Sequence, residues 1–429
     1  MIGRVRLLAC LGAALVGAPL ATGTSARADE TVKLKTAITL PNSQKIQSFD
    51  IGFVDPRIGI YVLADRTNAA IDVITTDNNK LVNQLKAGFA GPQGGNNDIA
   101  GPDGVIIVDH REVWAGDGDS TVKIINLNTG TFTTVSTCSG PGAPAGCTAA
   151  TAKRADELCE DTRHEVVLIA NDAATPHPFV TFISTETQAV LGHIVMDGMG
   201  GRPDATGGIE QCQWSHRTDK FYLNLPASAA HPAGEVVVIN AATRQIETSF
   251  TSLGTCAQPQ GMALGPDRQI LLGCNGSANS VIIDERDGHV IANLAGEGGS
   301  DEVYFNPGNN HYFLANSAAT PQNLGVVDAD KGSPTNDASF VTNDAGKGNV
   351  HSVAADPVTN QVYVPIPSTA TKGVCSAAGG IDAQGCIAVF ASPGECVAEG
   401  APVTRVSDDG NPEFRREHCR DRDDRGDDR

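Results

Sequence analysis

Short apolar segments alternate with turn-forming residues along most of this chain. The clearest example is 349–365, NVHSVAADPVTNQVYVP, in which a polar loop precedes an apolar segment, a turn at Asp356-Pro357 and a second apolar segment. The same unit recurs six more times, beginning at Phe49, Pro102, Ala155, Ile209, Pro259 and Ser300. A unit repeated at intervals of roughly 40 to 55 residues indicates a propeller or a similar repeat array.

Each copy continues in the same way after these two segments. A loop of small and polar residues leads to a third apolar segment such as TVKIIN or GEVVVIN, then a turn such as LNTG or AATR, and usually a fourth segment. Valine, isoleucine and aromatic residues favour strands, and Asp-Pro, Asn and Gly favour turns. Four strands in each of seven copies predict an all-β fold, a seven-bladed β-propeller of four-stranded blades.

Two copies carry a further pattern, Asp-Pro followed by Tyr-Val-Leu in the first copy (FVDPRIGIYVLAD) and by Tyr-Val-Pro in the last (ADPVTNQVYVP). With these motifs the chain resembles the YVTN-type family of secreted seven-bladed propellers. The likeness extends over nearly all of residues 29–395, and it implies the fold rather than a particular function.

The segment from Thr31 to Leu40, TVKLKTAITL, alternates like a strand but precedes the first complete copy. We expect it to supply the outermost strand of the last blade, because a propeller closed in this way leaves no open sheet edge.

The two ends of the chain differ from the repeats. Residues 1–28 combine a basic start, an apolar run and a small-residue site at Ala26-Arg27-Ala28, which predicts a cleaved signal peptide and a secreted or periplasmic protein. Residues 396–429 form a charged tail that we expect to be mobile. The propeller is expected to occupy 29–395.

The cysteine count agrees with export. The chain has 11 cysteines, and loss of Cys10 with the leader leaves an even ten. In an exported protein these indicate disulfides. Their places in the blades suggest the pairs Cys138 with Cys147, Cys256 with Cys274, Cys375 with Cys386, and Cys396 with Cys419. Cys159 and Cys212 remain, as either a bridge between adjacent inner strands or a thiol pair; an oxidising compartment favours the bridge.

The formal net charge of -19 limits the kinds of partner that the protein is expected to bind. A strongly acidic surface repels nucleic acid and anionic membrane, so neither is expected as a partner. We expect a monomer that binds a small molecule, a cation or a protein partner at the mouth of its central channel.

One repeat position is polar in every copy. It lies eleven or twelve residues before the central residue of each predicted second strand, where the chain enters the innermost strand. In a propeller these loops meet around one mouth of the channel. The seven residues are Asp50, Asp103, Asp156, Glu210, Gln260, Asp301 and His351.

Crowded carboxylates repel one another, so either some of them hold a proton or a cation neutralises them. Oxygen ligands suit a hard divalent ion, Ca²⁺ before Mn²⁺ or Mg²⁺, and His351 would also admit a transition metal. Glu302 and Glu157, each beside a ring acid, offer further oxygens. The alternative is a water-filled channel whose polar residues merely cap strand ends.

Other histidines divide by the face of the propeller. His110, His164, His216 and His311 fall at turns between first and second strands, away from the ring. His177 and His231 fall in loops between second and third strands, on the ring face. Together with His351, they are candidates for a metal ligand or a general base.

Two functions follow from these residues. The first is an exported binding propeller whose acidic mouth holds a ligand, with Gln260, Glu302 and His231 as contacts. The second is a metal-dependent, lactonase-like hydrolase with His351 or His177 as base. Gln260 is the ring's single amide, which departs from the lactonase-like pattern. The sequence lacks Gly-x-Ser-x-Gly, His-Glu-x-x-His and a phosphate-binding loop, so nucleophilic hydrolysis and nucleotide chemistry have no support.

Overall fold

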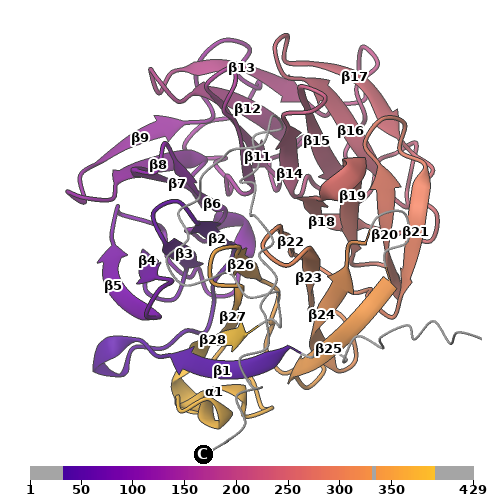
Figure 1. Cartoon of the computed structure of the whole chain (residues 1–429). Helices are drawn as coiled ribbons and strands as arrows, with labels where there is room; N and C mark the ends of the chain where they lie inside the picture. The colour runs from indigo at the N-terminus through magenta and orange to yellow at the C-terminus, as the bar shows by residue number, and fades with distance from the viewer. Residues whose placement is uncertain (1–31, 331–334, 392–429) are drawn as a thin grey trace, which may run out of the picture.

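The computed structural model describes residues 32–330 and 335–391. Seven antiparallel sheets of four strands each surround a central channel (Figure 1). The predicted seven-bladed β-propeller is therefore confirmed.

Six blades are each built from four consecutive strands, and the innermost strand comes first. The first three blades consist of β2 (Gly52–Asp55), β3 (Ile60–Asp65), β4 (Ala70–Thr75), β5 (Lys80–Leu85); β6 (Val105–Val108), β7 (Glu112–Asp117), β8 (Thr121–Asn126), β9 (Phe132–Ser136); and β10 (Leu158–Asp161), β11 (Val166–Asn171), β12 (Phe179–Ser184), β13 (Val190–Val195). The next three consist of β14 (Cys212–Ser215), β15 (Lys220–Leu225), β16 (Glu235–Asn240), β17 (Gln245–Phe250); β18 (Pro259–Leu264), β19 (Gln269–Cys274), β20 (Asn279–Asp284), β21 (Val290–Ala295); and β22 (Val303–Asn306), β23 (His311–Asn316), β24 (Gln322–Asp328), β25 (Thr335–Asn343).

The seventh blade joins the two ends of the propeller. Its order is β1 (Lys33–Ile38), β28 (Cys386–Ala391), β27 (Gln361–Ile366) and β26 (Ala354–Asp356), from the outside inward. Lys33 pairs with Ala391 in the antiparallel register of β1 and β28, which lie side by side in Figure 1. The expectation that residues 31–40 close the ring is confirmed.

Short helical turns connect some of these strands. They are the single-turn 3-10 helices η1 (Pro41–Ser43), η2 (Asn97–Ile99), η3 (Pro266–Arg268) and η4 (Asp382–Gln384), and the α-helix α1 (Val374–Ala377). No helix in the described part of the chain is both long and apolar enough to cross a membrane.

The core lies between adjacent blades. Large aromatic residues on the second strands are completely buried there, and Tyr61 of the first blade stacks on Tyr363 of the seventh with ring centroids 4.6 Å apart. Between the third and fourth blades, the ring centroids of Phe182 and Phe221 lie 6.0 Å apart. Each aromatic pair adds about 0.5 to 1.5 kcal/mol beyond the burial of its apolar surface, so these contacts fasten neighbouring blades.

Four predicted disulfides are present, and they are Cys138–Cys147, Cys159–Cys212, Cys256–Cys274 and Cys375–Cys386. The question left open for Cys159 and Cys212 is settled as a bridge, which joins β10 to β14. Four disulfides are typical of a protein from an oxidising, extracytoplasmic compartment. The predicted Cys396–Cys419 pair, the charged tail and the signal peptide with Cys10 lie outside the described residues.

Candidate ligand site at the acidic mouth of the channel

The ring residues are anchored by the same backbone bond in successive blades. The amide of Asp50 donates to the carbonyl of Ala64 at 2.9 Å, and the amide of Asp156 donates to that of Ala170 at 2.7 Å. The amides of Asp103, Glu210 and Asp301 each donate to a second-strand carbonyl in the same way. Local strand pairing thus carries every one of these side chains to the same height on the channel wall.

Most of these side chains surround a cavity of about 260 Å³. Its charged and polar lining includes Asp50, Arg66, Arg154, Asp156, Glu157, Glu210, Gln211, Gln260, Asp301, Glu302 and His351. Asp103 is completely buried just behind Arg66. We call this region the acidic mouth.

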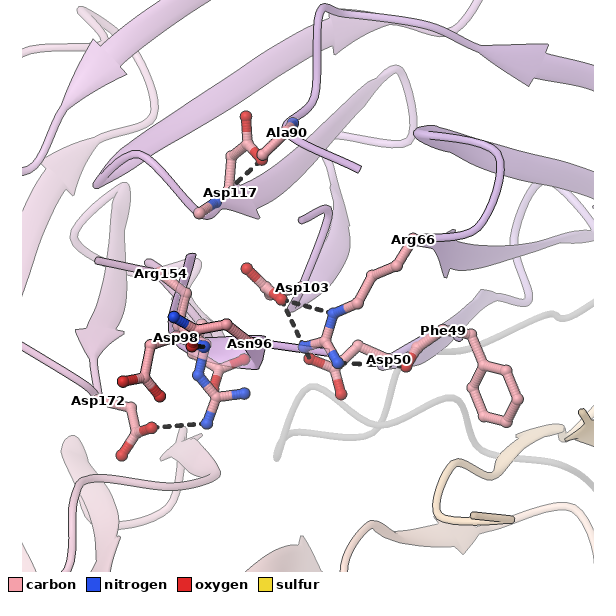
Figure 2. Close-up of polar contacts among 12 residues, drawn as sticks. Phe49, Asp50, Arg66, Ala90, Asn96, Asp98, Asp103, Asp117, Arg154 and Asp172 are labelled. Atoms are coloured by element: carbon pink, nitrogen blue, oxygen red, sulfur yellow. Dashed lines mark hydrogen bonds and ion pairs between the residues drawn. The ribbon is translucent and has the colours of Figure 1, made fainter. Parts of the chain in front are cut away.

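Arg66 is the centre of one side of the acidic mouth. It follows β3, its side chain is only 3% exposed, and its Nε donates to Asp103 Oδ1 at 2.8 Å. Its Nη2 donates to both Asp50 and Asp103. Figure 2 shows the guanidinium between these two carboxylates. A guanidinium that bridges two buried carboxylates removes much of their mutual repulsion.

Arg154 pairs with two carboxylates of the third blade. Its Nε lies 3.1 Å from Asp156 Oδ2, and its Nη2 donates to Asp172 Oδ2 at 2.6 Å (Figure 2). The ring hypothesis considered only the seven repeat positions and missed both arginines. The signal was present, because Arg154 stands two residues before Asp156 and Arg66 lies in a loop between second and third strands, on the face assigned to the ring.

His351 supplies a third positive group. Its ring stacks on Phe49 with centroids 4.9 Å apart, and its Nε2 lies 3.3 Å from Asp50 Oδ1. Burial lowers the pKa of His351, but the hydrogen bond with Asp50 and the charge of Asp301 outweigh it and raise the pKa above its usual value. The contact with Asp50 therefore favours the protonated imidazole.

The three carboxylates nearest the arginines titrate differently. Burial raises the pKa of Asp50, but Arg66 and His351 together bring it well below its usual range. For Asp103, burial and the charges of Asp156 and Asp50 outweigh Arg66 and raise the pKa well above its usual value. Burial raises the pKa of Asp156 to about 7. Arg66 and His351 therefore keep Asp50 ionised, whereas Asp103 and Asp156 retain an affinity for a proton or another cation.

The opposite side of the acidic mouth has carboxyls but no arginine in its lining. Burial raises the pKa of Glu157, Glu210 and Glu302 well above the usual value, and it also raises that of Asp301. Gln260 donates to Glu210 at 3.1 Å, and the amide of Val353 donates to Glu302 at 2.9 Å. Among the described residues, none forms a hydrogen bond or an ion pair with the side chains of Glu157 and Asp301.

The residues that directly follow the ring positions form an inner layer of the acidic mouth, and some blades have glycine there. Gly104 and Gly261 occupy the position that Glu157 and Glu302 occupy in other blades. A Cβ at Gly104 would lie 2.1 Å from the carbonyl oxygen of Asp156, which is a forbidden contact. The acids of the inner layer are therefore confined to the blades where the neighbouring strand leaves room.

Three ring carboxylates are close enough to share one ion. Asp50, Asp103 and Asp156 each offer an oxygen, and these oxygens lie within 4.8 Å of one another. Asp103 Oδ2 and Asp156 Oδ1 are buried and have no hydrogen-bond partner among the described residues. Unpaired carboxylate oxygens fit a hard divalent cation such as Ca²⁺. Two other groups with metal-ligand chemistry lie outside the mouth, one around His164 and one around His289.

The remaining candidate residues are distributed over different places. Gln260 and Glu302 line the acidic mouth with His351. His177 instead lines a separate cavity, where its Nδ1 lies 3.6 Å from Asp204 Oδ1. His231 belongs to the turn after β15, where its amide donates to Ser228 Oγ at 3.0 Å. The structure does not bring His177 or His231 together with His351.

Comparison with known proteins identifies the fold only. No family model and no curated protein sequence matches this chain. A chain in the crystal structure of a mitotic checkpoint complex is similar, with a TM-score of 0.58 and 12% sequence identity over 90% of this chain and 98% of that one. Similar chains of known structure number 1579, so the architecture is widely used and leaves function to be argued from the site.

Proposed function

We propose that this protein is an exported propeller of the YVTN type whose acidic mouth binds a small cation, with a hard divalent ion, Ca²⁺ first, as its occupant. The observation that carries the proposal is the pair of buried, unpartnered oxygens, Asp103 Oδ2 and Asp156 Oδ1, beside a third carboxylate. A buried polar atom without a partner costs about 1 to 3 kcal/mol, and a bound ion would remove that cost.

The charge balance of the acidic mouth supports the same proposal. Seven carboxyls meet there, and the positive groups among them are two arginines and one histidine. With every group ionised, four negative charges remain in a confined, largely buried space. Such a site either takes up protons, as the raised pKa values indicate, or attracts cations.

Hydrolysis receives less support from the same geometry. A general base must be free to accept a proton, whereas the raised pKa of His351 and its bond to Asp50 favour the protonated form. The second candidate base, His177, belongs to another cavity. We therefore propose binding rather than catalysis.

The test is elemental analysis of the purified protein before and after chelation, with a melting curve for each sample. We expect one divalent ion per chain and a lower Tm after chelation, restored by added Ca²⁺. Asp156→Asn should lose the ion, while Asp77→Asn, a charge-matched change at an exposed turn, should retain it. A protein that neither contains a divalent ion nor shifts its Tm with Ca²⁺, Mn²⁺ or Mg²⁺ would overturn the proposal.

A further inference from the structure

The opposite end of the channel has a second cavity of about 430 Å³. It is lined by the later residues of the innermost strands, which include the aromatic side chains of Phe53, Trp214, Tyr304 and Phe305 and the carboxylate of Glu160. We call this region the aromatic mouth. Its volume lies within the range of about 300 to 1,000 Å³ that is typical of small-molecule sites.

The aromatic residues of this cavity are only partly buried, whereas the large aromatics at the centre of the second strands are fully buried. Phe53, Trp214, Tyr304 and Phe305 all retain exposed surface, whereas the core residues Trp114 and Tyr312 are fully buried. A concave wall of partly exposed aromatic rings keeps apolar surface in contact with water, which a ligand with an apolar group would cover.

Glu160 is the charged group that this wall leaves unpaired. It projects from β10 and forms no hydrogen bond or ion pair with any described residue. Burial, with the charges of Asp109, Asp55 and Asp161, raises the pKa of Glu160 to about 7. The carboxylate is therefore a half-buried negative group without a counter-ion.

The two arginines beside this cavity are already engaged with other groups. Arg217 lines the cavity, but its Nε lies 2.9 Å from Glu285 Oε2 and its Nη2 donates to the carbonyl of Gly265 at 3.1 Å. Arg163 lies 5.8 Å from the Trp214 ring centroid and pairs with Asp219 at 3.0 Å. Neither guanidinium lies within ion-pair distance of Glu160, so the carboxylate remains available to pair with a charged ligand.

We propose that the aromatic mouth binds a small organic cation, an amine that carries an apolar group. Its ammonium pairs with Glu160, and its apolar group lies against the rings of Phe53, Trp214 and Tyr304. Aromatic faces attract cations as well as apolar groups, so the same wall serves both parts of the ligand. A bare metal ion is the wrong occupant here, because the carboxylates among the described lining residues are Glu160 and Glu302, and Glu302 already accepts from the amide of Val353, so too few oxygens are available.

The experiment compares benzylamine with benzyl alcohol, its neutral counterpart of nearly the same shape, at pH 8, where both the amine and Glu160 are charged. Trp214 fluorescence reports binding, since the chain has two tryptophans and the other, Trp114, is completely buried. Saturation-transfer NMR on each ligand provides a second readout that does not depend on tryptophan.

We expect benzylamine to bind at least ~10-fold more tightly than benzyl alcohol, as one charge-assisted contact implies. Glu160→Gln should abolish that preference and keep the melting curve, whereas Glu186→Gln, a surface control, should leave it unchanged. Trp214→Phe should remove the fluorescence signal. Equal binding of the two ligands, no binding of either, or a preference that survives Glu160→Gln would each overturn the proposal, independently of the outcome for divalent ions.

Discussion

The two mouths of the channel are built from the same innermost strands, yet their charged groups differ: most are paired at one mouth, and one carboxylate is unpaired at the other. The acidic mouth concentrates buried carboxyls and holds them with Arg66, Arg154 and His351. The aromatic mouth has one unpaired carboxylate, Glu160, within an apolar wall. Gln211 and Glu302 line both cavities, so a few residues along a strand separate these two environments.

The difference extends to what stabilises each mouth. Ion pairs connect the blades at the acidic mouth, since Arg66 of the first blade reaches Asp103 of the second. A covalent bond connects them at the aromatic mouth, where Cys159 and Cys212 join the third blade to the fourth. Charged contacts depend on pH and on counter-ions, whereas a disulfide depends on neither. We therefore expect the two mouths to respond to different perturbations.

The largest effect should follow removal of Arg66. Arg66→Met leaves Asp50 and Asp103 buried without their shared counter-ion, and we expect the free energy of unfolding to fall by about 3 to 5 kcal/mol in urea titrations. Arg111→Met, at an arginine whose pair with Asp109 is exposed, should cost about 0 to 1 kcal/mol. Equal costs for the two variants would contradict a structural role for the buried arginine.

A smaller effect should follow removal of the bridge at the aromatic mouth. The double variant Cys159→Ala, Cys212→Ala opens a loop of 53 residues, and a loss of about 2 to 4 kcal/mol is expected. The matched double variant Cys138→Ala, Cys147→Ala opens a loop of 9 residues and should cost about 1.5 kcal/mol less. Urea unfolding of both variants under oxidising conditions measures this difference in the free energy of unfolding. A larger loss from the variant with the shorter loop would contradict the prediction.

The smallest effect should be a gain in stability, produced by Glu157→Gln. Burial, then the charges of Asp156 and Asp50, raises the pKa of Glu157 well above 4.5, so the folded chain keeps a proton that the unfolded chain loses as pH rises. The contribution of Glu157 to wild-type stability therefore falls as pH rises above about 4.5, and Glu157→Gln avoids that loss. In chelator at pH 8 we expect the variant to be about 1 to 2 kcal/mol more stable than wild type, from ~1.4 kcal/mol per pKa unit.

The pH profile is the control for this last prediction. At about pH 3.5, below the unfolded pKa of 4.5, the gain should nearly vanish, because folded and unfolded chains then both hold the proton at this site. A gain from Glu157→Gln that is equal at both pH values would show that repacking, rather than charge, is responsible.

Repeats and periodicity were sufficient to predict the blades and the ring closure, because these depend on residues that recur at fixed spacing. The place of each cysteine in the blades predicted three disulfides, and the bridge between Cys159 and Cys212 was one of two alternatives. Counting also placed Asp50 and Asp156 at equivalent positions, and the backbone bonds of the innermost strands explain why that count works. These features depend on local chain geometry, which the sequence pattern expresses directly.

The contents of the two mouths were harder to predict. Arg66 and Arg154 belong to loops and have no counterpart in most copies, so a search of the repeat position alone passes over them. Trp214 occupies the strand position that Ile107 has in the second copy, and Tyr304 occupies the position that Cys159 has in the third. Only the three-dimensional ring gathers these two aromatic residues around one cavity. Where a site depends on exceptions to a repeat, the repeat itself cannot reveal it.

The pairing of β1 with β28 also bears on how this protein is made. Lys33 emerges early during synthesis, but its partner Ala391 is among the last described residues to appear. The seventh sheet can therefore assemble only after nearly the whole propeller has been produced, and contacts this distant in sequence form slowly. Until then β1 lacks its partner strand, and an unpaired strand edge favours aggregation. The chain is therefore most prone to aggregate between the synthesis of β1 and the closure of the ring.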